Sequence, residues 1–170
     1  MLPIRNPFLW LVRWRHRKGY GIHSPFAYNL VTQVLYTPGR YYADDRLDGL
    51  FPWWERYVLR RRLVCHRLLF RLANYWQPRE IHVPADVDGE VNSFLHAGCK
   101  HARLMMVDDE VLNYVGNRGR MVVVQNLSKH ARRWRQIVDD PRVTVSFDLG
   151  DMGVAFFLPR MEKQHYIINW

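Results

Sequence analysis

The stretch EIHVPADVDGE, residues 80–90, holds the residues best placed to bind a cofactor. Ile81 and Val83 alternate with polar residues, which predicts a strand, and a proline ends it. Asp86 begins a polar turn, and Gly89 opens a helix. The turn after such a strand is where α/β proteins usually hold a cofactor, and it usually contains several glycines because a Cβ would keep the ligand from the backbone. This turn contains one.

Acidic and amide side chains follow two later strands. Asp108 and Asp109 end the apolar stretch ARLMMVDD, for which we expect a buried strand, and Gln125 and Asn126 end RMVVVQN. Ligand crevices in α/β proteins lie outside the carboxyl ends of parallel strands, so these side chains could line one site. The alternative is that Asp108 and Asp109 cap the helix that follows them.

Other chemistry-bearing residues give weaker patterns. The stretch HAGCKH offers His96, Cys99 and His101, but zinc needs three or four ligands and no paired cluster is evident elsewhere. We therefore interpret these residues as incidental polar groups at a helix end. The sequence contains no nucleophile motif of the GxSxG type. His165 has no evident catalytic partner in the sequence.

The first half of the chain predicts helices that would position these residues. In residues 23–36, Ser24 is a good N-cap and Pro25 suits the first helical turn. We expect the face formed by Phe26, Leu30 and Val34 to pack on the α/β domain or on a second copy of the chain, since an exposed apolar face of that size is unusual. A polar connection, YYADDRLDGLFP, leads to a long helical stretch over residues 53–76.

The second half alternates strands and helices, which predicts an α/β fold. We expect EIHVPA, RLMMVD and MVVVQ to run parallel, and VTVSFDL and GVAFFL to form an antiparallel hairpin, with QHYIINW as a final strand. A helix with Ser128 as its cap joins MVVVQ to the hairpin. The prediction is a Rossmann-like core over residues 79–170 behind a helical extension over residues 1–78, together one structural unit.

Three stretches carry a resemblance to a known family: GIHSPFAYNLVTQVLY followed by a Tyr-Tyr pair, RLLFRLANYWQPREI, and DDPRVTVSFDLGDMGVAFFLP followed by KQHYIINW. The sequence resembles class I S-adenosylmethionine-dependent methyltransferases, in particular a bacterial subgroup with a helical N-terminal extension. Together the stretches cover roughly half the chain. The resemblance implies a mostly parallel, seven-stranded, Rossmann-like sheet whose last two sequential strands form a hairpin.

The resemblance assigns cofactor-binding roles to Ala85, Asp86, Gly89 and Asp108, with S-adenosylmethionine as the cofactor. In the family the first strand ends in an acidic residue and a glycine-rich turn that lets the backbone approach the methionine part of the cofactor. Here Pro84, Ala85 and a valine stand in that turn, and Gly89 alone matches. The turn therefore reads as a cofactor loop that has lost its glycines.

The resemblance also implies a site for a divalent cation. In metal-dependent relatives, carboxylates and an amide at such strand ends bind the ion, and hard cations prefer oxygen ligands. Asp108 and Asn126 are the candidates here. Gln125 stands where an acid is expected, so the site would have lost charge.

The chain is also shorter than the family's. Only residues 89–120 lie between the first strand and RMVVVQN, which is room for one strand where the family has more. We favour LMMVDD as the family's fourth strand because the next strand follows so closely. On that interpretation the sheet is truncated and the segment that holds the ribose hydroxyls is deleted.

The net positive charge of the chain points to anionic binding partners as well. The 170 residues carry a net charge of +9, which suits nucleic acid or an anionic membrane surface. The basic N-terminal half would make that contact: Phe8–Val12 is an apolar stretch followed by arginines, and an arginine-rich face with interleaved aromatics runs along residues 53–71. For the N-terminal stretch, the alternative is a basic helix packed on the domain. For the face along residues 53–71, we favour a solvated arginine face with its aromatics in the core.

Three functions follow from these patterns. The leading hypothesis is a degenerate methyltransferase-like protein of weak or no activity. The second is a working methyltransferase that transfers a methyl group to an oxygen or nitrogen nucleophile of a small molecule. The third is a basic module, without enzyme activity, that binds nucleic acid or an anionic membrane. Two cysteines in all fit a reducing cytosol, with peripheral membrane contact as an extension of that expectation.

Overall fold

The computed structural model describes residues 21–58, 60–107, 119–168 and 170. The chain forms two compact units, which we describe one at a time. The helical unit comprises the described residues up to Gln77 together with Asp88–Lys100. The sheet unit comprises Pro78–Val87 and the described residues from His101 onward.

Two sets of predicted residues fall outside the described part of the chain. One is the basic N-terminal stretch that includes Phe8–Val12. The other is the acidic pair Asp108 and Asp109, which follows the second strand. The expectations for both remain predictions.

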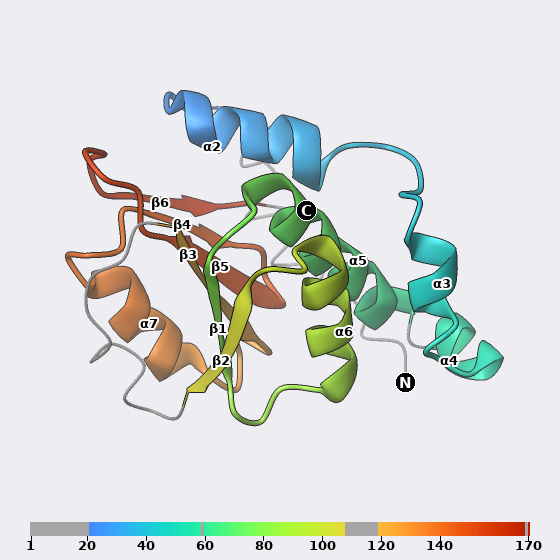
Figure 1. Ribbon diagram of the computed structural model, residues 1–170. Helices are drawn as coiled ribbons and strands as arrows, with labels where there is room; N and C mark the ends of the chain where they lie inside the picture. The colour runs from blue at the N-terminus through green and yellow to red at the C-terminus, as the bar shows by residue number, and fades with distance from the viewer. Residues whose placement is uncertain (1–20, 59, 108–118, 169) are drawn as a thin grey trace. The chain divides into compact units, whose positions relative to one another are not determined.

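In its described residues the helical unit contains these helical elements (Figure 1): α2 Pro25–Leu30, the π-helical η2 Val31–Leu35, α3 Asp44–Asp48, α4 Trp53–Val58, α5 Arg60–Trp76 and α6 Gly89–Gly98. As predicted, Ser24 caps α2: its side-chain oxygen accepts a hydrogen bond from the Ala27 amide at 3.3 Å, and Pro25 occupies the first turn. The segment expected to be only a polar connection contains α3. Two aspartates in the first turn of α3 favour its N-terminus electrostatically.

The predicted apolar face of the first helix is covered inside the helical unit. Leu30 and Val34 are each 1% exposed, and α5 packs against η2. Phe26 is half-buried and meets the ring of Trp76 on α5 edge-on, with the ring centroids 5.3 Å apart. The partner of this face is therefore another helix of the same unit.

Helices α5 and α6 lie side by side (Figure 1). Their contact depends on Gly98, because a Cβ at that position would come 2.4 Å from the backbone oxygen of Phe70 and 2.9 Å from Cβ of Ala73. Phe70 and Phe94 belong to the apolar core of this unit. The remaining buried members of that core are Ala43, Leu47, Phe51 and Leu63.

The sheet unit is built on a six-stranded mixed sheet in the order β2-β1-β3-β5-β4-β6. The strands are β1 Glu80–Pro84, β2 Arg103–Val107, β3 Arg120–Gln125, β4 Val145–Asp148, β5 Met152–Phe156 and β6 Gln164–Ile167. The three strands predicted to be parallel are parallel, with β1 pairing with both β2 and β3. The predicted antiparallel hairpin is β4–β5, and β6 adds to β4 in parallel. The mostly parallel α/β sheet is thus confirmed.

Strand β2 differs from its prediction as a buried strand. It pairs with β1 alone and forms an edge of the sheet. Met105 is 38% exposed and Met106 is 59% exposed, so its apolar run does not mark a core strand. Strand β2 comes directly before β3 in the order of strands along the chain, but the two are not neighbours in the sheet, because β1 lies between them.

Helix α7, Ala131–Asp139, lies on one face of this sheet, where Trp134 covers β5 (Figure 1). Its N-cap is His130, whereas the sequence predicted Ser128. The difference arises because the residues after β3 first form a turn, in which the amides of Lys129 and His130 both donate to the carbonyl of Asn126. The core beneath α7 contains Val122, Val124, Leu127, Trp134, Ile137, Val143 and Ala155.

Candidate functional site

At β1 the strand order of the sheet unit reverses direction. From β1 the chain continues to β2 on one side of it, and later returns to β3 on the other side. In open α/β sheets the crevice outside the carboxyl ends of such a pair of strands is the usual ligand site. At this edge of the sheet, formed by the carboxyl ends of β1 and β3, lie Ala85 and Asp86 after β1, and Gln125 and Asn126 at the end of β3.

Asp86 is already paired with two basic side chains at this edge. Its carboxylate accepts a hydrogen bond from Nζ of Lys129 at 3.0 Å and lies 3.3 Å from Nε2 of His130. The hydrogen bond from Lys129 lowers the pKa of Asp86, and the nearby imidazole acts in the same direction. Asp86 is therefore a surface carboxylate that its basic neighbours hold in the ionised form.

The turn after β3 brings these two basic residues to Asp86. Asn126 has a positive φ of 51°, a left-handed conformation that asparagine tolerates better than most residues. Its carbonyl accepts hydrogen bonds from the amides of Lys129 at 2.8 Å and His130 at 3.1 Å. The turn thus reverses the chain within a few residues and starts α7 beside the end of β1.

The predicted cofactor residues are divided by the structure. Ala85 and Asp86 are exposed and follow β1, whose neighbour β3 ends at Gln125. Gly89 is the first residue of α6, as predicted, and belongs to the helical unit. Asp108 lies outside the described residues, so the predicted cation pair of Asp108 and Asn126 is only half described.

Among the described residues, no group of three or more His, Cys, Asp or Glu side chains is arranged to hold a metal ion. Sequence reasoning did not single out Lys129 and His130. Their distance from the end of β3 was the available signal, because a residue three or four positions past a strand end can reach the neighbouring strand end through a tight turn.

A second polar contact joins β4 to β6. The hydroxyl of Ser146 lies 2.8 Å from Nδ1 of His165, so His165 has a serine partner that sequence reasoning did not identify. Ser146 is 1% exposed, and Trp134 lies next to His165 with ring centroids 6.3 Å apart. A substrate cannot reach a hydroxyl buried to this degree, so we interpret the pair as a contact that ties the edge strand to the sheet.

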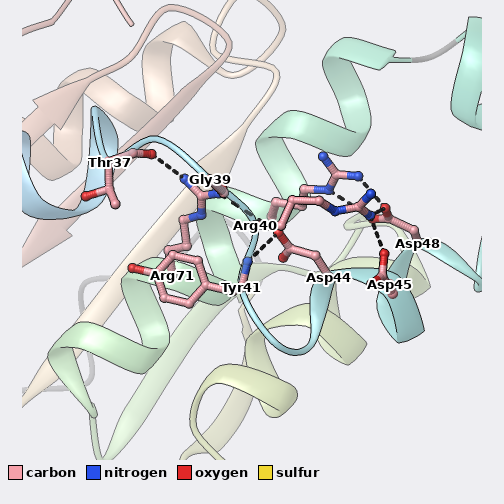
Figure 2. A network of polar contacts seen from close by, with 9 residues as sticks. Thr37, Gly39, Arg40, Tyr41, Asp44, Asp45, Asp48 and Arg71 are labelled. Carbon is pink, nitrogen blue, oxygen red and sulfur yellow. Dashed lines mark hydrogen bonds and ion pairs between the residues drawn. The ribbon is translucent and has the colours of Figure 1, made fainter.

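The arginines of α5 are largely engaged inside the helical unit. Figure 2 shows Arg71 donating to the carbonyl oxygens of Thr37 at 3.2 Å and Gly39 at 2.7 Å. Its guanidinium also lies 4.8 Å from the ring centroid of Tyr41. These contacts hold the segment that precedes α3 against α5, so this arginine is not part of a free phosphate-binding face.

Two further arginines meet at a buried carboxylate. Asp48 is 4% exposed and receives hydrogen bonds from Nε of Arg67 at 3.0 Å and from Arg40 at 2.7 Å. Arg40 also bridges to Asp45 (Figure 2). The solvated arginine face favoured from the sequence is therefore wrong for Arg67, because its charge serves an internal ion pair.

The aromatics interleaved with these arginines are also placed differently from expectation. Trp53, Trp54 and Tyr57 were expected in the core, yet they are 77%, 50% and 85% exposed. No residue of α4 is buried. The surface of the helical unit therefore presents large aromatic side chains at α4.

Within the described residues, no helix combines the length and the apolar character that crossing a membrane requires. No protein-family model, curated protein or solved structure matches this chain.

Proposed function

We propose that the chain is a degenerate S-adenosylmethionine-dependent methyltransferase-like protein that binds the cofactor weakly or not at all. One observation carries the proposal: the carboxylate after β1, Asp86, is already paired with Lys129 and His130. A carboxylate at this place would otherwise be available to the ammonium group of the methionine part of the cofactor. Binding the cofactor there requires the internal pair to be broken first.

The arrangement of the sheet supports this assignment. Strands β1 and β3 are parallel neighbours, and the last strand of the β4–β5 hairpin inserts antiparallel beside β3. A ligand edge at β1 and β3 and a closing hairpin are what the resemblance implies. The sheet has six strands where the family has seven, and that difference agrees with a shortened domain.

The position of β2 changes one part of the assignment. In a doubly wound sheet the second strand lies beside the first, and the fourth lies on the first strand's other side. Strand β2 is the neighbour of β1 on the side away from β3, which is the place of a second strand. Within this proposal, the position of β2 favours LMMVDD as a second strand over the fourth-strand interpretation. The ribose-binding segment need not be deleted, and Asp108 follows the strand that would carry it.

The turn itself weakens cofactor binding. The amide of Val87 donates to the carbonyl of Pro84 at 3.2 Å, which closes the chain just after β1. Pro84, Ala85 and Val87 each carry a Cβ where the resemblance expects glycines. Gly89 belongs to the helical unit, and a Cβ built there would meet nothing within 4 Å, so packing within the protein does not itself require glycine at this position.

The alternative is a working methyltransferase in which the cofactor displaces Lys129 from Asp86. In that case Asp86 and the α7 end of the site would position the cofactor for direct methyl transfer to an oxygen or nitrogen nucleophile. Half-exposed ion pairs are weak, about 0–1 kcal/mol, so displacement is physically accessible. Affinity for the cofactor separates the two functions.

The test is calorimetric titration of the full chain with S-adenosylmethionine, with and without magnesium. If Asp86 stays paired with Lys129, the cofactor forgoes a hydrogen bond to that carboxylate, which weakens binding by roughly 1.5–3 kcal/mol, or about ten- to a hundredfold. We therefore expect no binding in the low micromolar range. A low micromolar dissociation constant in either condition would replace our proposal with the working-enzyme alternative.

A variant tests the role of the ion pair. Lys129→Ala removes the lysine hydrogen bond to Asp86 and leaves only His130 beside that carboxylate among its described partners, and we expect this variant to bind the cofactor more tightly than the unaltered chain does. The matched control is Lys100→Ala, which removes an exposed lysine of the helical unit. Equal affinity in both variants would show that the Asp86–Lys129 pair does not limit cofactor binding.

A further inference from the structure

Helix α4 exposes an unusual set of large apolar side chains. Trp53 is 77% exposed, Trp54 50%, Tyr57 85% and Val58 42%, and no residue of the helix is buried. Leu50, just before the helix, is 49% exposed. Single exposed apolar side chains are normal on a protein surface, but a contiguous group marks a site of interaction.

The four of these side chains that belong to α4 share one side of the helix. With about 3.6 residues per turn, side chains four positions apart lie on the same face. Trp53 therefore stands above Tyr57, and Trp54 stands above Val58 in the adjacent row. Glu55 and Arg56 fall outside these two rows. We name Leu50, Trp53, Trp54, Tyr57 and Val58 the α4 surface.

The α4 surface is bordered by positive charge. Residues 53–61 contain three arginines, Arg56, Arg60 and Arg61, and a single acid, Glu55. Arg56 and Arg60 are exposed, in contrast to Arg67 and Arg71, which the helical unit uses internally. A partner of this surface therefore needs both apolar groups and negative charge.

We propose that the α4 surface docks on a lipid bilayer that contains anionic phospholipids. Tryptophan and tyrosine favour the boundary between headgroups and acyl chains, because each has an apolar ring and a polar group. Exposed arginines next to such rings are attracted to anionic headgroups within the screening distance of the membrane surface. An interfacial helix with aromatic and basic residues is a known mode of peripheral binding.

The aliphatic members of the α4 surface favour lipid over nucleic acid. Bases stack on aromatic rings, and Tyr57 with either tryptophan could serve a single strand in that way. Leu50 and Val58 offer no stacking plane, yet both can enter the acyl boundary. The bordering arginines also disfavour a symmetric contact between two copies, since the same charges would face each other. This inference does not depend on the proposed function.

The experiment is flotation of the full chain with two kinds of vesicle, one of phosphatidylcholine alone and one of phosphatidylcholine mixed with phosphatidylglycerol. We expect binding to the mixed vesicles and much less to the neutral ones. The variant Trp53→Ala/Trp54→Ala/Tyr57→Ala should weaken binding to the mixed vesicles at least about tenfold, because it removes three interfacial rings. Replacing Arg56 and Arg60 by glutamine should reduce the preference for the anionic lipid.

The matched control is Tyr28→Ala/Tyr75→Ala, which removes exposed rings of the same unit from α2 and α5. It should leave binding within about twofold of the unaltered chain. All the altered residues are exposed, so thermal melts should coincide and show that each variant folds.

Several outcomes would overturn the proposal: no binding to mixed vesicles, equal binding to both kinds, or an α4 triple variant that binds as well as its control. Two further measurements would identify which competing partner, nucleic acid or a second copy of the chain, binds the α4 surface instead. Binding of a single-stranded oligonucleotide that depends on Trp53 and Tyr57, without vesicle binding, would assign the surface to nucleic acid. A dimer in sedimentation that the triple variant dissociates would assign it to a second copy.

Discussion

The indole of Trp134 lies directly on Gly153. A Cβ built on Gly153 would come 2.6 Å from Cε3 and Cζ3 of the ring, closer than nonbonded carbon atoms approach. Gly153 sits on β5 opposite Val124 of β3, so the missing side chain lets α7 settle on the middle of the sheet. The same helix begins at His130, which meets Asp86. The packing of one glycine therefore helps to position the candidate site.

We expect Gly153→Ala to destabilise the protein by about 1–3 kcal/mol, because the added methyl overpacks a filled core. Urea unfolding measures the change. In a double-mutant cycle, Trp134→Leu should remove much of the penalty of the alanine, since the clash involves that ring. Additive effects of the two substitutions would contradict the proposed contact.

Two glycines at opposite ends of α6 give a matched comparison. A Cβ on Gly98 meets the backbone oxygen of Phe70 at 2.4 Å, whereas a Cβ on Gly89 meets nothing within 4 Å. We expect Gly98→Ala to destabilise by about 1–3 kcal/mol, because backbone cannot move aside. Gly89→Ala should be neutral or slightly stabilising, by less than about 1 kcal/mol. Thermal unfolding of both variants checks this, and equal melting temperatures would refute it.

Removal of Arg67 should destabilise the helical unit. Asp48 is buried, and Arg67→Ala leaves its carboxylate to Arg40 alone. We expect a loss of about 1–3 kcal/mol, below that of a fully orphaned buried charge. The control Arg60→Ala alters an exposed arginine of the same helix and should stay within about 0.5 kcal/mol of the unaltered chain. Similar losses in both variants would place Arg67 among the surface arginines.

Acid should weaken the fold through His66. Burial lowers the pKa of His66, and a hydrogen bond between Nδ1 and the carbonyl of Arg62 at 2.7 Å only partly opposes this. Phe51 and Phe94 pack against the ring, and its Nε2 is buried without a hydrogen-bond partner in the described structure. Below the unfolded pKa of about 6.5, the unfolded chain takes up a proton that the folded chain resists. The free energy of unfolding therefore falls with decreasing pH until the folded pKa is passed.

We expect His66→Leu to reduce this dependence, by at most about 1.4 kcal/mol per pH unit in the window below about pH 6.5. Part of the slope should remain, because burial also lowers the pKa of His82 on β1. The control His23→Gln alters an exposed histidine away from this aromatic cluster. Denaturation at a series of pH values measures all three chains. An unaltered slope in His66→Leu would mean that His66 titrates alike in both states.

The elements were largely predictable from the sequence. Ser24 and Pro25 identified the start of α2, and the runs EIHVPA and MVVVQ identified two central strands, because capping and hydrophobic periodicity act over a few neighbouring residues. The runs VTVSFDL and GVAFFL identified the antiparallel hairpin for the same reason. The edge place of β2 was not predictable, since an apolar run such as LMMV has the same local pattern in the middle of a sheet and at its edge.

The tertiary structure alone decided how the polar and aromatic residues are used. Asp86 was recognisable as a strand-end acid, but its pairing with Lys129 and His130 depends on a turn that brings together residues more than forty positions apart in the sequence. The sequence by itself determined that α4 would contain two tryptophans, a tyrosine and neighbouring arginines. Whether those rings would be buried depended on which helices pack around them, and no sequence period encodes that. Composition and local periodicity are properties of short segments, whereas burial and ion pairing arise only when distant segments meet.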